Sequence, residues 1–277
     1  MNSEQIEHVL AGRFGEAIAV PADVAPLTGL AAIAARRVHR TYSARPVSEE
    51  LVRLLCACAL SAPSKSDLQQ RDIVVIGDPS MRAAIATLLP HMPWVEAAPV
   101  FLVFCANARR VKQVSQLRAK PFPNDHMDLF FNAVGDAAIA LATCLIAAES
   151  IGLGACPISE IRNHAKQIDG MLQLPEQVIP FAGLCLGWPA AEDTISPRLP
   201  LKMTVHRDRY SEPPLDAALR DYDGRRETLQ PYEKQYQPER WGIAQTYGWS
   251  EQKARQYAVP QRVDFGAYVR SKGFSLE

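Results

Sequence analysis

The sequence lacks the signatures of several common protein classes. It has no net charge, because 30 basic residues balance 30 acidic ones, and this argues against a nucleic-acid-binding surface. It contains no CxxC pair, and its six histidines are not grouped beside its six cysteines, so we expect no metal site. It also contains no GxSxG elbow, P-loop, GxGxxG turn or HExxH helix. The usual arguments for a serine hydrolase, a nucleotide-hydrolysing enzyme, a Rossmann protein or a zinc protease are therefore missing.

Long hydrophobic runs are also scarce. The longest, residues 132–150, contains Asp136 and Glu149 and is rich in small residues, so it predicts a buried packing helix and no membrane partner. The N-terminus does not have the basic-then-apolar order of a secretory signal. Most cysteines stand in apolar segments, where a thiol behaves as a small hydrophobe. We therefore expect a cytoplasmic protein with reduced core cysteines.

What the chain does contain is a mixture of helix and strand patterns. Apolar runs bounded by glycine and proline predict buried strands at residues 72–76, 100–105 and 178–186, with a possible edge strand at 203–206. Helical spacing and capping residues predict helices at residues 3–17, 49–62, 80–89, 132–150 and 161–172. Residues 107–125 are polar and predict a surface excursion. This order of elements predicts an α+β three-layer sandwich.

Three polar segments could carry chemistry. Arg36, Arg37 and Arg40 are spaced to lie within one helical turn, where their guanidinium groups could converge on a phosphate or simply remain solvated at a helix end. Residues 62–69 form a polar loop before a buried strand, which could bind a heterocycle, although loops are polar by default. Arg198 stands between two prolines, which suits either a preordered anion ligand or a surface turn.

The order and spacing of these segments resemble those of the FMN-dependent nitroreductase family, within it the NADPH-linked oxygen-insensitive nitroreductases and flavin reductases. The matching stretches are RRVHRTYSARPVSEE, SAPSKSDLQQRDIVVIGD, PWVEAAPVFLVFCAN, LIAAESIGLGACPISEIRN and GLCLGWPAAEDTISPRLPLKMTVHRDRY, with a C-terminal match in YGWSEQKAR to YVRSKGF. The resemblance implies a nitroreductase-like three-layer sandwich with a central mixed, mainly antiparallel sheet flanked by helices, in an intertwined homodimer. It implies an N-terminal extension at residues 1–30, an FMN-binding core at 31–210, and a C-terminal helical extension at 211–277 that wraps the core or a partner subunit.

The resemblance also implies a reaction. FMN is the expected cofactor and NADPH or NADH the electron donor, with hydride transfer through flavin N5 in a ping-pong mechanism. The expected partners are a second copy of the chain and a small electron acceptor such as a nitroaromatic, a quinone or a flavin. The alternatives are a flavin-dependent reductase or dehydrogenase dedicated to a single metabolite, and a flavin-binding protein with little turnover.

Residue roles follow from the matching positions. By resemblance, the FMN-binding residues are Arg36, Arg37, Arg40 and Arg198 at the phosphate, Ser64, Asp67 and Gln69 along the ring and ribityl chain, and Ile158 and Ser159 near flavin N5. Ser159 and Glu160 replace a glycine pair of the relatives and are the candidate catalytic residues, although Glu160 could also point to solvent. Trp94, at the expected entrance, and Arg240, at the extra phosphate of NADPH, are the candidate substrate-binding residues. Trp94 could equally be a half-buried packing residue.

Besides Ser159 and Glu160, four further departures from the family pattern alter the expected pocket. Val38 stands where relatives commonly have a serine, Asp67 where they have an asparagine, and Met92 where they have a glutamine. A carboxylate cannot donate the hydrogen bonds of an amide. Gln245 replaces a second arginine near Arg240. These changes leave room for a specialised acceptor.

Overall fold

The computed structural model describes residues 1–212 and 214–277. The chain divides into two compact units. The first combines residues 1–37 with 193–261, and the second combines residues 38–192 with 262–277.

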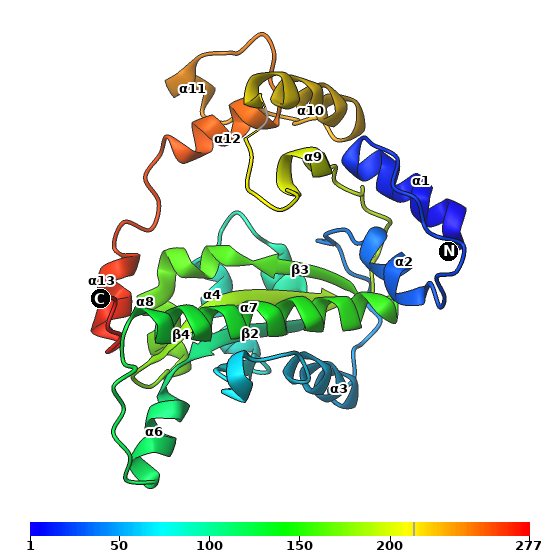
Figure 1. Cartoon of the computed structure of the whole chain (residues 1–277). Helices are drawn as coiled ribbons and strands as arrows, with labels where there is room; N and C mark the ends of the chain where they lie inside the picture. The colour runs from blue at the N-terminus through cyan, green and yellow to red at the C-terminus, as the bar shows by residue number, and fades with distance from the viewer. Residues whose placement is uncertain (213) are drawn as a thin grey trace. The chain divides into compact units, whose positions relative to one another are not determined.

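The second unit is built on a four-stranded antiparallel sheet of order β1-β2-β4-β3 (Figure 1). The strands are β1 (Arg71–Val75), β2 (Val100–Asn107), β3 (Gly154–Ile158) and β4 (Val178–Gly187). Side chains of β2 alternate between two cores, with Leu102 and Phe104 in one and Phe101 and Val103 in the other. Both faces of the sheet are therefore covered. The predicted α+β three-layer sandwich, with its mainly antiparallel sheet, is confirmed.

Two sets of helices cover the sheet. One face carries α3 (Glu49–Leu60) and α7 (Met127–Ser150). The other carries α4 (Pro79–Thr87), α5 (Trp94–Ala97), the 3₁₀ helix η2 (Ser159–His164) and α8 (Ala165–Leu172). Two further helices, α6 (Arg109–Leu117) and α13 (Phe265–Ser271), belong to this unit, and Figure 1 shows α6 standing away from the sheet.

Helix α7 is long and apolar enough to cross a membrane by length and composition alone. Its fully buried positions, however, form a row of small residues packed in the sheet core: Ala133, Ala137, Ala140, Cys144 and Ala148. Just beyond the end of the helix stands Gly152, whose φ of +88° is left-handed and whose N–H donates to the Glu149 carbonyl at 3.1 Å. The Leu153 N–H donates to the Ala148 carbonyl at 3.0 Å, which completes a Schellman motif. The predicted packing helix with a glycine at its end is confirmed.

Within the described residues, the regular secondary structure of the first unit is entirely helical. The helices are α1 (Ser3–Phe14), α2 (Thr28–Ala34), α9 (Leu201–Thr204), α10 (Leu215–Leu229), α11 (Pro238–Trp241) and α12 (Trp249–Tyr257). Asn2 and Gln5 form a capping box that starts α1. Helices α10 and α12 meet through the rings of Tyr222 and Trp249, whose centroids are 5.5 Å apart in an edge-to-face arrangement.

Two local predictions were wrong. The expected edge strand at residues 203–206 is instead the short helix α9, because its first three residues, Leu201–Met203, are good helix formers. The arginines were expected on one helical turn, but α2 ends at Ala34 and residues 36–40 are not helical. The backbone there turns toward the sheet instead, and the His39 N–H donates to the Ala155 carbonyl of β3 at 3.2 Å.

Candidate functional site

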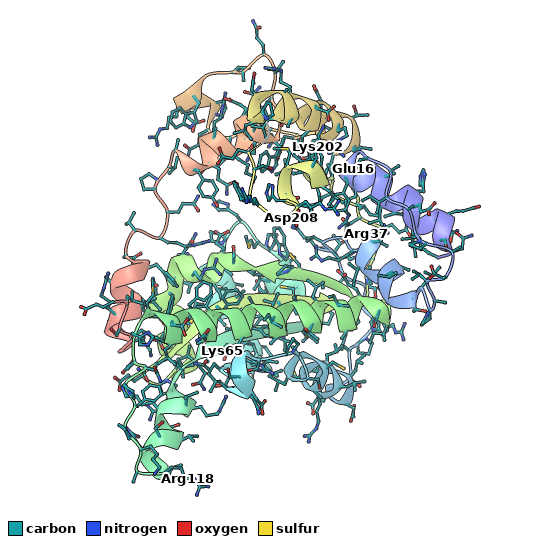
Figure 2. The ribbon with its side chains drawn as sticks, viewed as in Figure 1. Glu16, Arg37, Lys65, Arg118, Lys202 and Asp208 are labelled. Atoms are coloured by element: carbon teal, nitrogen blue, oxygen red, sulfur yellow. The ribbon has the colours of Figure 1, made fainter. Side chains whose placement is uncertain are left out.

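A single carboxylate organises the polar loop that precedes β1. Asp136 of α7 has a side chain only 2% exposed. It accepts hydrogen bonds from the Ser64 hydroxyl at 2.6 Å, from the Gln70 N–H at 2.8 Å and from the Lys65 N–H at 3.1 Å. Arg71 forms an ion pair with it at 3.4 Å. Figure 2 marks Lys65 on this loop. The loop is thus fixed to the core helix at several points.

The electrostatics of Asp136 follow from these contacts. Burial raises its pKa, but the hydrogen bonds from Ser64, Gln70 and Lys65 and the charge of Arg71 together outweigh burial, so the pKa is lowered. The carboxyl is therefore ionised at neutral pH. Sequence reasoning used Asp136 only as an argument against a membrane span. One feature of the sequence does indicate its structural role: a single acid inside an apolar helix is costly to bury unless other groups bind it.

The loop backbone adopts left-handed conformations at three residues other than glycine. Ser66, Asp67 and Gln69 have φ values of 49°, 56° and 52°, a conformation that costs energy and is often found at binding sites. The side chains of Asp67 and Gln69 are exposed, and the Gln69 amide donates to the Asp67 carboxylate at 3.2 Å. Ser64, by contrast, is used within the loop, because its hydroxyl also accepts the Gln69 N–H at 2.7 Å.

The end of β3 carries the predicted catalytic segment. Ile158 is buried in the core, Ser159 is exposed and Glu160 is half-buried at the start of η2. Backbone N–H groups in the first turn of a helix lack partners within it. They are therefore the groups of this segment that could face a ligand.

Sequence reasoning missed Arg262, which lies against this segment. Its Nη2 donates to the Ser159 carbonyl at 3.3 Å and its Nε donates to the Asn163 side chain at 2.5 Å. Burial lowers the pKa of the neighbouring Arg162, and the charge of Arg262 lowers it further. Two guanidinium groups, those of Arg162 and Arg262, thus lie close to this segment. No motif around Arg262 could have indicated this, because the contact joins residues about a hundred positions apart.

Trp94 and Arg40 lie together in the second unit. Trp94 is half-buried against the core. The guanidinium carbon of Arg40 is 5.0 Å from the centre of its ring, which is cation–π distance. Trp94 is therefore a packing residue that also contacts an arginine, and its place at the entrance of a substrate site stays a prediction.

The remaining predicted arginines belong to the first unit. Arg198 is exposed, and its N–H donates to the carbonyl of Arg13 at 2.6 Å. The guanidinium of Arg13 in turn donates to the Arg36 carbonyl. Arg37 donates to the Asp193 carbonyl at 3.0 Å. Arg13, which sequence analysis did not single out, thus connects Arg36 with Arg198.

Arg240 is exposed on α11 and stacks on Trp241, with its guanidinium carbon 4.7 Å from the ring centre. Gln245 is also exposed. Among residues 1–212 and 214–277, no group of three or more histidine, cysteine, aspartate or glutamate side chains could hold a metal ion.

Comparison with known proteins identifies the fold. The structure of B. megaterium NfrA2 superposes with a TM-score of 0.81 at 30% identity, covering 90% of this chain and 99% of that one. The FMN reductase [NAD(P)H] of Bacillus subtilis is 31% identical over 245 residues, which cover 87% of this chain and 95% of the relative. The NADPH-flavin oxidoreductase of Vibrio harveyi is 32% identical over 243 residues, 88% of this chain and 96% of the relative.

The fold is therefore that of the nitroreductase class of α+β sandwiches. The nitroreductase family model matches residues 33–188, and the model of the family's C-terminal domain matches residues 196–277. The chain belongs to the nitroreductase family.

Proposed function

We propose that this protein is an FMN-dependent NAD(P)H oxidoreductase that passes electrons to a small electron-poor acceptor. The observation that carries the proposal is the match to both parts of the family, together with curated relatives named as flavin reductases over nearly their whole length. FMN, when bound, supplies hydride transfer at N5, and the protein supplies anchoring, orientation and electrostatics. The residues present fit such a cofactor, because exposed arginines and an exposed amide–carboxylate loop suit a phosphate and a polar ring edge.

The phosphate role falls to arginines of the first unit. We assign it to Arg198, with Arg36 and Arg37 in support. The Arg198 backbone is held on both sides, because its N–H donates to Arg13 and its carbonyl accepts from Arg225 at 2.8 Å. Arg40 lies in the second unit beside Trp94, and its phosphate role is a prediction from the resemblance.

The ring-edge role falls to the loop fixed by Asp136. Gln69 and Asp67 are the side chains left exposed for a ligand. Ser64 is a positioning residue, because its hydroxyl donates to Asp136 and accepts the Gln69 N–H, and both hydrogen bonds hold the loop itself. The left-handed backbone of this loop is consistent with a conformation kept for binding.

The catalytic role falls to the end of β3. Backbone N–H groups at Ile158, Ser159 and Glu160 are the donors expected to stabilise negative charge on a reduced ring. The guanidinium of Arg262, which donates to the Ser159 carbonyl at 3.3 Å, would add positive charge beside these donors. The half-buried Glu160 is the basis of the second candidate function, a reductase of a single metabolite, because a carboxyl beside the ring would restrict which acceptors can approach.

Trp94 and Arg240 remain the proposed substrate-binding residues, with a nitroaromatic, quinone or flavin as acceptor and NADPH or NADH as donor. The ping-pong order of the reaction stays a prediction from the resemblance. The six cysteines are free, which supports the proposed cytoplasmic location.

We also propose a homodimer. Helix α7 exposes a stripe of large apolar side chains, Phe131 at 72%, Ile139 at 41% and Ile146 at 37%, and the adjacent α3 exposes Leu54 at 57%. These positions recur at helical spacing on the face of α7 opposite the sheet. Contiguous exposed apolar surface of this kind is typical of a subunit interface.

The proposed function is tested by the visible spectrum of the purified protein, followed without oxygen as NADPH or NADH is added. We expect the purified protein to show the visible absorption peaks of flavin, and we expect these peaks to bleach promptly when one of the two donors is added. Arg198→Ala is expected to lower the flavin content of the purified protein by about tenfold, since one charge-assisted contact is lost, while Arg209→Ala, another exposed arginine of the same unit, serves as the control. Bound flavin that stays oxidised with both donors would favour the flavin-binding protein with little turnover.

A further inference from the structure

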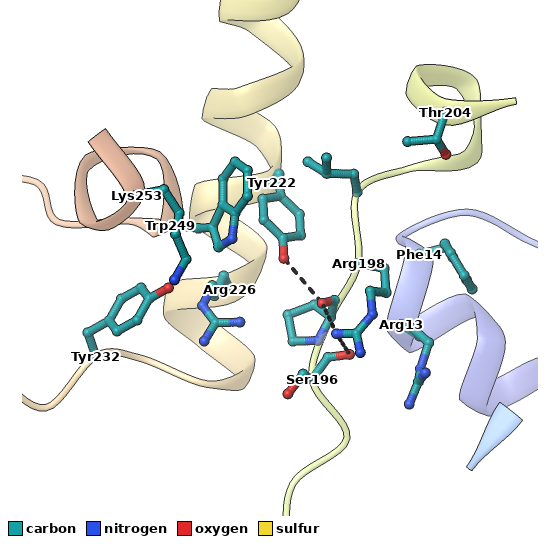
Figure 3. Close-up of a pocket in the computed structure, with 12 residues that line it drawn as sticks. Arg13, Phe14, Ser196, Arg198, Thr204, Tyr222, Arg226, Tyr232, Trp249 and Lys253 are labelled. Carbon is teal, nitrogen blue, oxygen red and sulfur yellow. Dashed lines mark hydrogen bonds between the residues drawn. The ribbon is translucent and has the colours of Figure 1, made fainter. Parts of the chain in front are cut away.

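The segment that carries Arg198 has no regular secondary structure to fix it. Residues 192–200 form neither helix nor strand, so the position of this backbone depends on hydrogen bonds to neighbouring elements. Helix α10 provides two of them. The Tyr222 hydroxyl donates to the Pro197 carbonyl at 3.1 Å (Figure 3), and the Arg225 guanidinium donates to the Arg198 carbonyl at 2.8 Å.

Residues 13–16, which we call the α1 end, provide two further bonds. The Arg198 N–H donates to the Arg13 carbonyl at 2.6 Å. The Leu201 N–H donates to the Glu16 carboxylate (Figure 2). One bond is made at Arg198 itself and the other three residues beyond it. The α1 end therefore holds the backbone of this segment at two points.

The α1 end also contacts a second arginine of the candidate site. The Arg13 guanidinium donates to the Arg36 carbonyl. Arg225 of α10 donates to the Arg13 carbonyl at 3.3 Å as well as to the Arg198 carbonyl. The α1 end thus joins the backbones of Arg36 and Arg198, which lie far apart in the sequence, and Arg225 connects both sides of this contact.

The α1 end lies outside the part of the chain that the family models match. These models match residues 33–188 and 196–277, so Arg36 and Arg198 lie within the matched ranges and the α1 end lies before them. The N-terminal extension therefore meets the matched part of the chain at the arginines to which the proposed function assigns the cofactor phosphate.

We propose that the N-terminal extension is a positioning element for the cofactor, in which the α1 end fixes the backbone of Arg198 and so raises the affinity for FMN. An arginine on a backbone that is already fixed loses less conformational freedom when it binds an anion. Glu16 is a positioning residue here, because it acts on Arg198 through the Leu201 N–H. The inference rests on the proposed function, in which Arg198 binds the phosphate of FMN.

The test measures the Kd of FMN in full-length variants of Glu16. Glu16→Ala removes the acceptor of the Leu201 N–H, and we expect it to raise the Kd by roughly fivefold, the equivalent of one net hydrogen bond. Glu16→Gln keeps an acceptor oxygen and should raise the Kd by less than about twofold. Glu7→Ala is the matched control, because Glu7 accepts the Val20 N–H at 2.6 Å within the extension itself. It should leave the Kd unchanged.

A double-mutant cycle separates positioning from general destabilisation. Arg198→Ala alone is expected to weaken FMN binding by about tenfold, because a charge-assisted contact is lost. If Glu16 acts through Arg198, adding Glu16→Ala to Arg198→Ala must change the Kd by less than about twofold. A merely structural role of the α1 end would give the same fold-change whether or not Arg198 is present.

Thermal unfolding identifies a variant that does not fold. If Glu16→Ala is such a variant, Arg225→Lys takes its place, because a lysine keeps the charge but lacks the fork that reaches the carbonyls of both Arg13 and Arg198. The same loss of affinity is then expected, and again only while Arg198 is present.

An unchanged Kd in Glu16→Ala, an equal loss in Glu7→Ala, or equal losses with and without Arg198 would each overturn the proposal. Failure of the proposed function is recognised separately. It shows in the unmodified protein, as absent flavin binding or as a bound flavin that neither donor bleaches, and failure of the phosphate assignment shows in Arg198→Ala alone, as an unchanged Kd.

Discussion

At the scale of single residues, Asp136 connects the core helix to the candidate ring-binding loop. Three hydrogen-bond donors and Arg71 meet its buried carboxylate. Removing the charge of Asp136 is costly, because the charge of Arg71 then stays buried without its partner. We expect Asp136→Asn to destabilise the protein by about 3 kcal/mol, measured by urea unfolding. Asp128→Asn, at an exposed position in the first turn of the same helix, is expected to change stability by less than about 1 kcal/mol.

The same residue gives a pH dependence with a definite sign. Because the pKa of Asp136 is lowered in the folded protein, its contribution is fully present above the unfolded pKa of about 4 and is lost as pH falls through the folded pKa. The difference in unfolding free energy between the unmodified protein and Asp136→Asn should therefore shrink below about pH 4. A difference that stays constant from pH 7 to pH 3 would contradict the ionised role.

Residue roles were only partly predictable. The resemblance led to Asp67, Gln69 and Ser159, because they stand inside recognisable stretches. Arg13, Asp136 and Arg262 were missed, because their partners lie far along the chain and no local pattern encodes such contacts. Ser64 stood in the predicted loop, yet its hydroxyl turns inward to Asp136, a direction that spacing alone cannot give.

At the scale of elements, the C-terminal end of α1 depends on a glycine. Gly15 has a φ of +72°, and a Cβ there would lie 2.5 Å from the Arg225 guanidinium. Alanine at this position would be strained and would displace Arg225 from the carbonyls of Arg13 and Arg198. We expect Gly15→Ala to cost about 1–3 kcal/mol in thermal or urea unfolding.

Gly12 provides the matched control on the same helix. Nothing lies within 4 Å of a Cβ built there, and the position is inside α1. Gly12→Ala should therefore stabilise the protein by roughly 0.5–1 kcal/mol through higher helix propensity. Equal effects of the two substitutions would mean that the left-handed end of α1 is not constrained.

Elements with strong local signals were predicted well. Strands β1, β2 and β4 are apolar runs between breakers, and each was found within one or two residues of its expected bounds. No bounds were predicted for β3, which is short and contains Pro157. The errors fell where tertiary contacts compete with local spacing. Residues 36–40 leave the helix because the backbone at His39 pairs with β3, and residues 109–117 form a helix inside the predicted excursion.

At the scale of the whole molecule, the sequence led to the family through the order of several modest motifs rather than through any one of them. Assembly was inferred from the resemblance alone. The structure adds a physical argument, because α7 buries one side in the sheet core and leaves Phe131, Ile139 and Ile146 exposed on the other. A helix that carries apolar side chains on both faces is typically buried on both, here by the sheet on one side and by a second subunit on the other.

This argument predicts the effect of a charge on α7. In a twofold dimer Ile139→Glu would place a carboxylate in each half of the interface, at a cost on the order of 3 kcal/mol per copy. We expect light scattering at micromolar concentration to give twice the chain mass of 30.6 kDa for the unmodified protein and the single-chain mass for Ile139→Glu. Leu117→Glu, a matching substitution at an 83% exposed leucine of α6, should leave the dimer intact. A single-chain mass for the unmodified protein would mean that the α7 stripe has another partner, and an intact Ile139→Glu dimer would place the interface elsewhere.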